Sequence, residues 1–99
     1  MLMNELKELI QKNKFVVVDF YANWCGPCKV LLSTIDSIKE KYQDVVFVKS
    51  DVETDETSTE YGVRNLPTLI FFKDGEAVNR LTGAIPAVEL ETAVNELIK

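Results

Sequence analysis

The sequence predicts a single α/β domain spanning residues 1–99, with a central mixed sheet of about four strands flanked by helices on both faces. Two apolar runs, residues 15–20 and 45–50, are separated by a helical pattern, which is typical of parallel strands joined by a helical crossover. Two further strand patterns meet at Asp74-Gly75, a pair favoured in two-residue hairpin turns. No repeat or linker interrupts the chain, and 99 residues with 46% hydrophobic content suit one core.

The chain should begin with a short amphipathic helix followed by a buried strand. Apolar residues recur at helical spacing from Leu2 to Ile10, and Asn4 is the candidate N-cap. This helix should end near Asn13. The run from Phe15 to Phe20 is rich in β-branched and aromatic residues without polar alternation, which indicates a strand buried on both faces.

The middle of the chain predicts a long helix, a second strand and a polar segment. Apolar side chains keep a helical register up to about Tyr42, and residues 45–50 form the second buried strand. Residues 51–62 are polar throughout. A short helix there would be capped by Thr54 or Asp55 and stopped by the glycine that ends the segment.

The last third of the chain predicts a hairpin and a final helix. Residues 68–73 and 77–82 are the two hairpin strands. Pro86 fits the first turn of the helix that follows. The apolar stripe expected on the buried face of this helix comprises Leu90, Ala93, Val94, Leu97 and Ile98.

The composition argues against several classes of function. The 16 acidic residues outnumber the 11 basic ones, giving a net charge of −5, and no basic cluster could neutralise a run of phosphates. We therefore expect no nucleic-acid partner. No apolar run is long enough to span a bilayer, and residues 1–12 carry acids where a signal peptide would carry a basic region. We expect a cytoplasmic protein without a membrane partner.

Both cysteines of the chain lie in the stretch NWCGPCK, residues 23–29. A structural disulfide between them would close a very small loop, which gives the least entropic stabilisation. Zinc usually takes four ligands, and with no histidine and no second cysteine pair, only a dimer or carboxylates could complete a site. We therefore expect no metal and favour a working redox pair.

The spacing and position of the cysteines favour disulfide exchange. Residues three apart share a helix face, so Cys25 and Cys28 can meet in the first turn of the long helix. A helix N-terminus stabilises a thiolate, which is the nucleophile in such exchange. Cys25, placed first, should attack, and Cys28, one turn deeper, should resolve the mixed disulfide. Gly26 would let a substrate backbone approach closely, and Pro27 would make the connector rigid.

Three sequence blocks carry a resemblance to a known family. VVVDFYANWCGPCK, YGVRNLPTLIFFKDG and LTGA resemble the blocks of the thioredoxin family, in the same order and across nearly the whole chain. The resemblance implies the thioredoxin fold and a general protein-disulfide reductase, a dithiol electron carrier for cell redox homeostasis with no bound cofactor. It also implies disulfide-containing substrate proteins and recharging by an NADPH-dependent thioredoxin reductase.

Asp19 is the one ionisable side chain in the first strand pattern. It could simply turn to water at the strand end. Alternatively, a buried carboxyl with a raised pKa could take the proton from Cys28 and return it later. The resemblance implies this second role. It also places Lys49 beside Asp19, where the ammonium would moderate the charge, although on sequence alone Lys49 could equally be a solvated lysine.

The proline block and the single tryptophan complete the predicted site. The bond before Pro67 would by frequency be trans, but the resemblance implies a cis proline that faces the cysteines and keeps metal ions away. The backbone of Leu66 could then pair with an extended substrate segment. Trp24 and its neighbours resemble the apolar rim on which thioredoxins dock partners. The other members of this rim are Gly26, Pro27, Leu66, Gly83 and Ala84.

Two features depart from the family pattern. Ser33 stands where thioredoxins commonly have a helix-kinking proline, so we expect a straighter long helix. The segment MLM is too short for the family's usual first strand, which would leave residues 45–50 as an edge. We expect a monomer, although a free edge could pair with another chain.

The alternative to a redox carrier is a scaffold protein whose cysteines are dispensable for its function.

Overall fold

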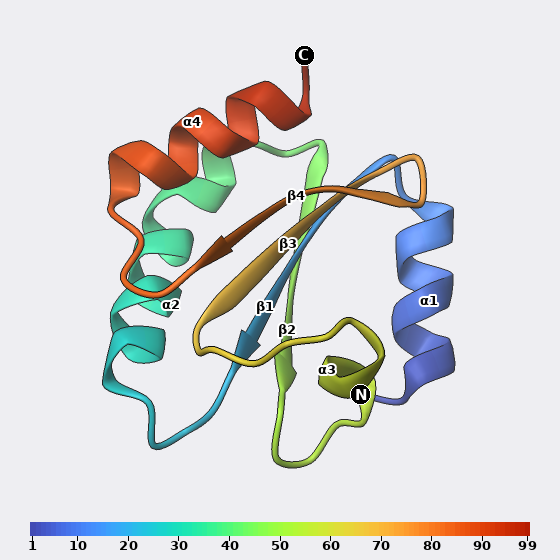
Figure 1. Ribbon diagram of the computed structural model, residues 1–99. Helices are drawn as coiled ribbons and strands as arrows, with labels where there is room; N and C mark the ends of the chain where they lie inside the picture. The colour runs from blue at the N-terminus through green and yellow to red at the C-terminus, as the bar shows by residue number, and fades with distance from the viewer.

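In the computed structural model, which describes all residues 1–99, four strands form one mixed sheet with helices on both faces (Figure 1). The elements in chain order are α1 (Met3–Lys12), β1 (Phe15–Tyr21), α2 (Gly26–Ile38), a 3-10 turn (Lys39–Lys41), β2 (Val45–Asp51), α3 (Thr57–Glu60), β3 (Thr68–Lys73), β4 (Glu76–Thr82) and α4 (Ala87–Leu97). The strand order is β2-β1-β3-β4, so β2 is an edge as the sequence indicates. β1 runs parallel to β2 and antiparallel to β3, which confirms the mixed sheet.

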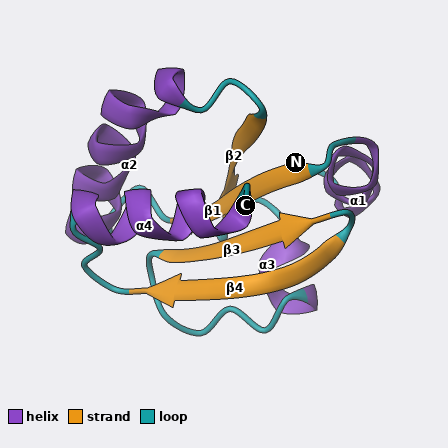
Figure 2. Ribbon diagram, turned by 90° about the horizontal axis from the view of Figure 1, so that it is seen from above, coloured by secondary structure: helices purple, strands orange, loops and turns teal.

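β1 is the strand that organises both faces of the sheet. Its residues from Val16 to Phe20 are all buried, because α2 and α4 cover one face and α1 and α3 the other (Figure 2). Successive side chains of a strand point to opposite faces. Val17 therefore joins the core cluster under α2 and α4, whereas Val16 and Val18 join the cluster under α1. By the same alternation, Asp19 points to the α2 face.

The helices pack through the apolar stripes that their sequences predict. Leu6 and Ile10 of α1 are buried, as are Leu31 and Ile35 of α2. Each fully buried side chain of this size contributes about 1.5–3 kcal/mol relative to an exposed one. α2 continues without a break through Ser33. None of the helices combines the length and apolarity needed to cross a bilayer.

Both predicted helix caps are wrong. α1 has Leu2 rather than Asn4 at its N-cap, and the backbone N–H of Leu2 donates to Glu5 Oε1 at 3.0 Å. The N-cap of α3 is Glu56 rather than Thr54 or Asp55. Asp55 does not cap this helix because its carboxylate accepts bonds from the end of β2 instead.

The C-terminal third follows the sequence prediction with two small differences. Asp74 and Gly75 have φ values of 51° and 86°, the positive values that a two-residue hairpin turn of this kind requires. Pro86 lies at the N-cap of α4 rather than in its first turn. Ile98 is 38% exposed, which contradicts its expected burial, because α4 ends at Leu97.

Candidate active site

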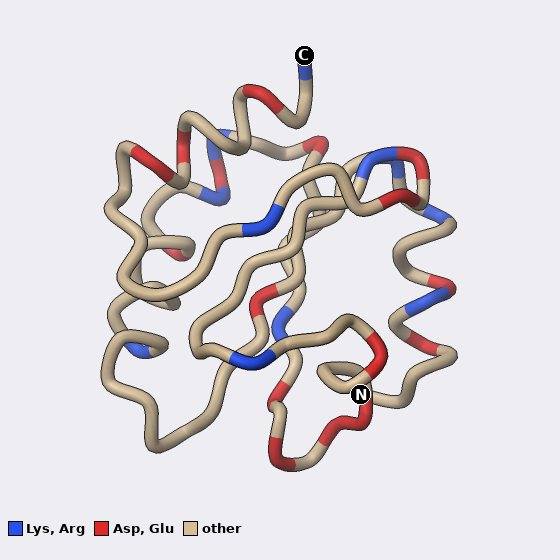
Figure 3. The backbone as a smooth tube through the Cα atoms, viewed as in Figure 1, with Lys and Arg blue, Asp and Glu red and all other residues tan.

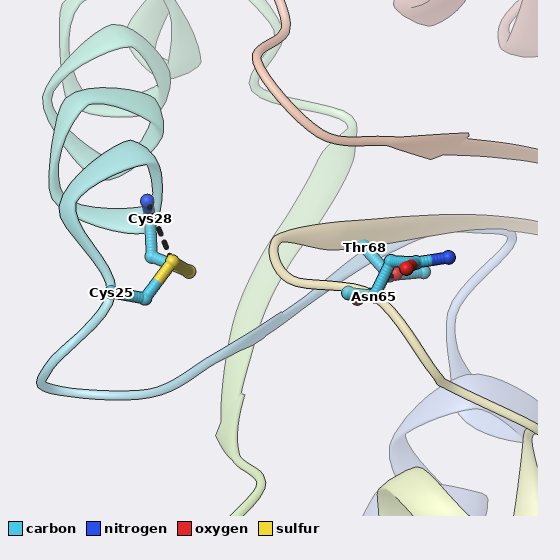
Figure 4. Close-up of a disulfide and its surroundings, with 4 residues drawn as sticks. All are labelled: Cys25, Cys28, Asn65 and Thr68. Atoms are coloured by element: carbon cyan, nitrogen blue, oxygen red, sulfur yellow. Dashed lines mark hydrogen bonds between the residues drawn. A yellow bond between two sulfur atoms is a disulfide. The ribbon is translucent and has the colours of Figure 1, made fainter.

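The two cysteines meet where α2 begins. Cys25 is the N-cap of α2 and Cys28 is its third residue, and the two form a disulfide with their Cα atoms 5.2 Å apart (Figure 4). The backbone N–H of Cys28 donates to Cys25 Sγ at 3.2 Å. N–H groups in the first turn have no intrahelical acceptor. In the reduced protein, this geometry would direct a free donor and the positive end of the helix dipole at the Cys25 thiolate.

The sulfur pair sits in a small apolar cluster with limited exposure. Cys25 is 6% exposed and Cys28 is 2% exposed, and both pack with Ala22. The connector between them, Gly26 and Pro27, is exposed. Access to the disulfide is therefore from the Cys25 side, across the exposed connector.

The loop before β3 supports the cysteine cluster from a distant part of the sequence. Leu66 packs against the cluster, and the bond between Leu66 and Pro67 is cis, as the resemblance implied. Thr68 Oγ1 donates to the carbonyl of Asn65 at 2.6 Å (Figure 4). The N–H of Gly83 donates to the carbonyl of Pro67 at 2.9 Å. These bonds fix the end of β4 beside the loop before β3.

An apolar surface surrounds the disulfide. Trp24 is 69% exposed, and Pro27 and Ala84 are exposed as well. Leu66 and Gly83 are half-buried. Pro27 and Ala84 both line an open groove of about 380 Å³ between the start of α2 and the loop before α4. The structure thus brings together the rim residues that the sequence places 57 positions apart.

This groove extends further than the sequence indicated. Val30 is 68% exposed and lines it together with Ile85 and Pro86. Val30 lies three residues after Pro27, on the same face of α2. Helical spacing from the connector could therefore have identified it.

Asp19 is a buried carboxyl without a protein partner. It is 3% exposed, and neither carboxylate oxygen has a hydrogen-bond partner in the chain. Burial raises the pKa of Asp19 to about 7, and the charge of Lys49 lowers it only in part. The structure therefore confirms the buried carboxyl and excludes the alternative of a strand-end residue turned to water. A carboxyl with this pKa can accept or release a proton near neutral pH.

Lys49 lies beside Asp19 without forming an ion pair with it. The two residues are partners in the parallel register of β1 and β2. The Lys49 ammonium instead lies 5.8 Å from the centroid of the Tyr21 ring. Such a position over an aromatic face is itself favourable for a cation. Tyr21 was not identified from the sequence, although its place two residues after Asp19 puts it on the same face of β1.

Two neighbouring cavities lie on this face of the sheet. One of about 170 Å³ is lined by Asp19, and one of about 110 Å³ is lined by Cys28. Leu32 and Lys49 line both cavities. Leu32 was also missed, yet it lies four residues after Cys28 and hence on the same face of α2. Leu32 and Lys49 therefore link the cavity that Asp19 lines to the cavity that Cys28 lines.

Acidic side chains are concentrated between β2 and α3, apart from the two cysteines. Figure 3 shows Asp and Glu gathered between the end of β2 and the end of α3, where Asp51, Glu53, Asp55, Glu56 and Glu60 lie. No group of three or more histidine, cysteine, aspartate or glutamate side chains is arranged to hold a metal ion.

The family model described as thioredoxin matches residues 2–96 of the chain. A thioredoxin of Mycoplasmoides gallisepticum is 48% identical over 96 residues, covering 96% of this chain and 92% of that protein. A thioredoxin of Porphyra purpurea is 41% identical over 95 residues, covering 93% of this chain and 88% of that protein.

Solved structures agree with these sequence matches. The oxidised form of mitochondrial thioredoxin 3 from Saccharomyces cerevisiae matches with a TM-score of 0.90 and 35% identity, covering 96% of this chain and 90% of that one. Fasciola hepatica thioredoxin matches with a TM-score of 0.90 and 35% identity, covering 96% of this chain and 93% of that one. The similarity therefore extends over the sheet, the helices and the cysteine site together.

Proposed function

The chain belongs to the thioredoxin family, and on this premise we propose which residue performs each step of disulfide reduction. Thioredoxins are protein-disulfide oxidoreductases, and this chain is a dithiol/disulfide carrier that acts through the Cys25–Cys28 disulfide. Cys25 is the attacking thiolate, Cys28 is the resolving thiol, and Asp19 is the proton acceptor and donor. One observation carries this assignment: the N–H of Cys28 donates to Cys25 Sγ at the start of α2.

The reaction proceeds in two exchanges. The Cys25 thiolate attacks one sulfur of the substrate disulfide, so a mixed disulfide forms and the first substrate thiolate leaves. Cys28 then loses its proton to Asp19 and attacks Cys25 Sγ. The second substrate thiolate leaves as the Cys25–Cys28 disulfide forms. The substrate gains two electrons, and the chain loses two.

Asp19 suits the proton step because of its environment. Its pKa of about 7 leaves it partly ionised near neutral pH, so the carboxylate can take the Cys28 proton and the acid can give it back. The two cavities that share Leu32 and Lys49 bring this carboxyl near the inner cysteine. Lys49 moderates the charge that develops on Asp19.

Substrates and the recharging enzyme would meet the same surface. An extended substrate segment pairs with the backbone of Leu66, while its apolar side chains pack on Trp24 and the other rim residues. Gly26 and Pro27 leave the approach to Cys25 open. Family membership supports an NADPH-dependent thioredoxin reductase as the source of electrons.

A trapping experiment tests the roles assigned to Cys25 and Cys28. With Cys28→Ser, the attack on a disulfide substrate such as insulin should proceed, but the mixed disulfide should persist because the resolving thiol is missing. Mass spectrometry should find the substrate attached to Cys25. With Cys25→Ser, no stable adduct should accumulate. Equal trapping by both variants, or insulin reduction by either at the wild-type rate, would overturn the assignment.

A further inference from the structure

A small cavity lies between α2 and the half of the sheet formed by β1 and β2. Its volume is about 170 Å³. Apolar side chains from three elements line it, namely Val17 of β1, Ile35 of α2 and Phe47 of β2. For comparison, an apolar cavity of about 150 Å³ in another protein binds benzene. The cavity thus has room for one aromatic ring.

The cavity also contains a buried charge without a partner. Asp19 lines it, is 3% exposed, and has no protein hydrogen-bond partner for either carboxylate oxygen. A buried carboxylate is costly unless donors or a cation compensate it. A ligand that brings a positively charged donor into this cavity would satisfy that need.

The cations already present are engaged elsewhere. Lys39 lines the cavity but forms an ion pair with Asp36 at 3.0 Å. Lys49 also lines it but lies over the Tyr21 ring, 5.8 Å from its centroid. Neither lysine forms an ion pair with Asp19, so the carboxylate remains available to an incoming cation.

We propose that this cavity binds a single-ring aromatic monocation, an arylamidine or arylmethylammonium, with its cationic group on Asp19 and its ring against Ile35 and Phe47. An amidinium can donate two parallel hydrogen bonds to one carboxylate, the strongest geometry for such a pair. The inference does not depend on the proton role proposed above, because it concerns binding to the oxidised protein without turnover.

Binding of this kind is linked to protonation of Asp19. Only the ionised carboxylate attracts the cation, and burial raises the pKa of Asp19 to about 7. Affinity should therefore rise as the pH is raised through this range. The other charged groups that face the cavity are Asp36 and Lys39 from α2 and Lys49 from β2. Asp36 is the only other carboxylate among them and supplies the matched control.

The test is an NMR titration of the oxidised, ¹⁵N-labelled protein with benzamidine, and with benzamide as a neutral probe of the same shape. At pH 8, benzamidine should shift the amides of Val17, Ile35 and Phe47. Its affinity should fall about tenfold at pH 6, as expected when a carboxyl of pKa about 7 becomes protonated. Benzamide should bind at least tenfold more weakly than benzamidine at pH 8.

Two variants decide whether Asp19 is the partner. Asp19→Asn should weaken benzamidine binding at least tenfold and remove its pH dependence. Asp36→Asn should bind benzamidine with the wild-type affinity and the wild-type pH dependence. Equal affinity for the wild type and Asp19→Asn would overturn the proposal. So would the absence of binding, or shifts centred on the groove near Pro27 and Ile85. The pH titration uses only the wild type, so it decides the matter even if a variant folds poorly.

Discussion

Two carboxylates near the same edge of the sheet show how hydrogen-bond partners change the effect of burial on the pKa. Asp19 of β1 is buried, whereas Asp55, which follows β2, is half-buried with its side chain turned inward. Asp55 accepts hydrogen bonds at 3.0 Å from Ser50 Oγ and from the backbone N–H of Asp51, and it also contacts the amine of Met1. Asp19 accepts none.

The pKa values of the two residues differ accordingly. Burial by itself would raise the pKa of Asp55, but hydrogen bonds from the Met1 amine, Ser50 and Asp51 outweigh it and lower the pKa below 3.8. Burial raises the pKa of Asp19 to about 7 because no such donors are present. Hydrogen-bond partners, rather than burial alone, thus decide whether a carboxylate holds the structure together or remains chemically reactive.

The largest expected effect is on stability, with Asp19→Asn. The pKa of Asp19 rises from 3.8 to about 7, and each pKa unit corresponds to about 1.4 kcal/mol. Because the folded protein holds this proton more tightly than the unfolded chain, the wild type loses stability as the pH rises from 3.8 through 7. Asp19→Asn should therefore be about 4 kcal/mol more stable than the wild type at pH 9.

Urea unfolding at several pH values measures this difference. The difference in unfolding free energy should shrink as the pH falls and vanish near pH 3, where the wild-type carboxyl is mostly protonated in both states. A difference independent of pH would mean that Asp19 acts by its shape rather than its charge.

The opposite effect is expected for Asp55→Asn. The variant should lose about 2 kcal/mol of unfolding free energy at pH 7, because hydrogen bonds to a charged acceptor contribute about 1.5–3 kcal/mol each and the amide retains only part of them. The pKa of Asp55 is lowered, so its contribution is present above pH 3.8 and is lost as the pH falls through its native pKa. Thermal unfolding followed by circular dichroism should show the full loss at pH 7 and a smaller loss at pH 3, below the unfolded pKa.

The two variants should also separate in activity. Asp19→Asn should slow insulin reduction at pH 7 by about tenfold, less than the roughly 10²–10⁴-fold that a general base typically contributes, because water can replace part of its role. Asp55→Asn should reduce insulin at the wild-type rate. If both variants slow the reaction equally, the effect belongs to the fold and not to proton transfer.

The smallest effect is expected from Lys49→Met. Removing the ammonium should raise the pKa of Asp19 slightly, because Lys49 lowers it and burial dominates. NMR titration of the Asp19 carboxyl carbon would measure the change, with Lys39→Met as a control because Lys39 is paired with Asp36. A lower pKa in Lys49→Met would contradict the role assigned to Lys49.

Sequence patterns predicted the strands and the redox pair well because their signals are local. The continuous apolar run before Asp19 indicated a strand buried on both faces, and the structure confirms it. The spacing of Cys25 and Cys28 predicted that they could meet at a helix start, which the structure also shows.

The errors concern residues whose partners lie elsewhere in the chain or just beyond a helix end. Asp55 was a candidate cap by residue type, but its carboxylate is bonded to Ser50 and the backbone of Asp51. Ile98 matched the helical stripe, but α4 ends one residue earlier. The orientation of Lys49 toward the Tyr21 ring depends on side-chain packing across two strands, which no spacing rule specifies.

The central place of β1 in the sheet has a consequence for hydrogen exchange. This strand has β2 on one side, β3 on the other and helices over both faces. Amides in such a strand exchange with solvent mainly when the whole domain opens. Asp19 is therefore carried by the segment that should open last, and deuterium uptake along β1 should report the global stability of the molecule. Because the folded protein holds the Asp19 proton more tightly than the unfolded chain, the protection of β1 should decrease as the pH rises from 3.8 to about 7 and level off above it, even though no bond to Asp19 is broken.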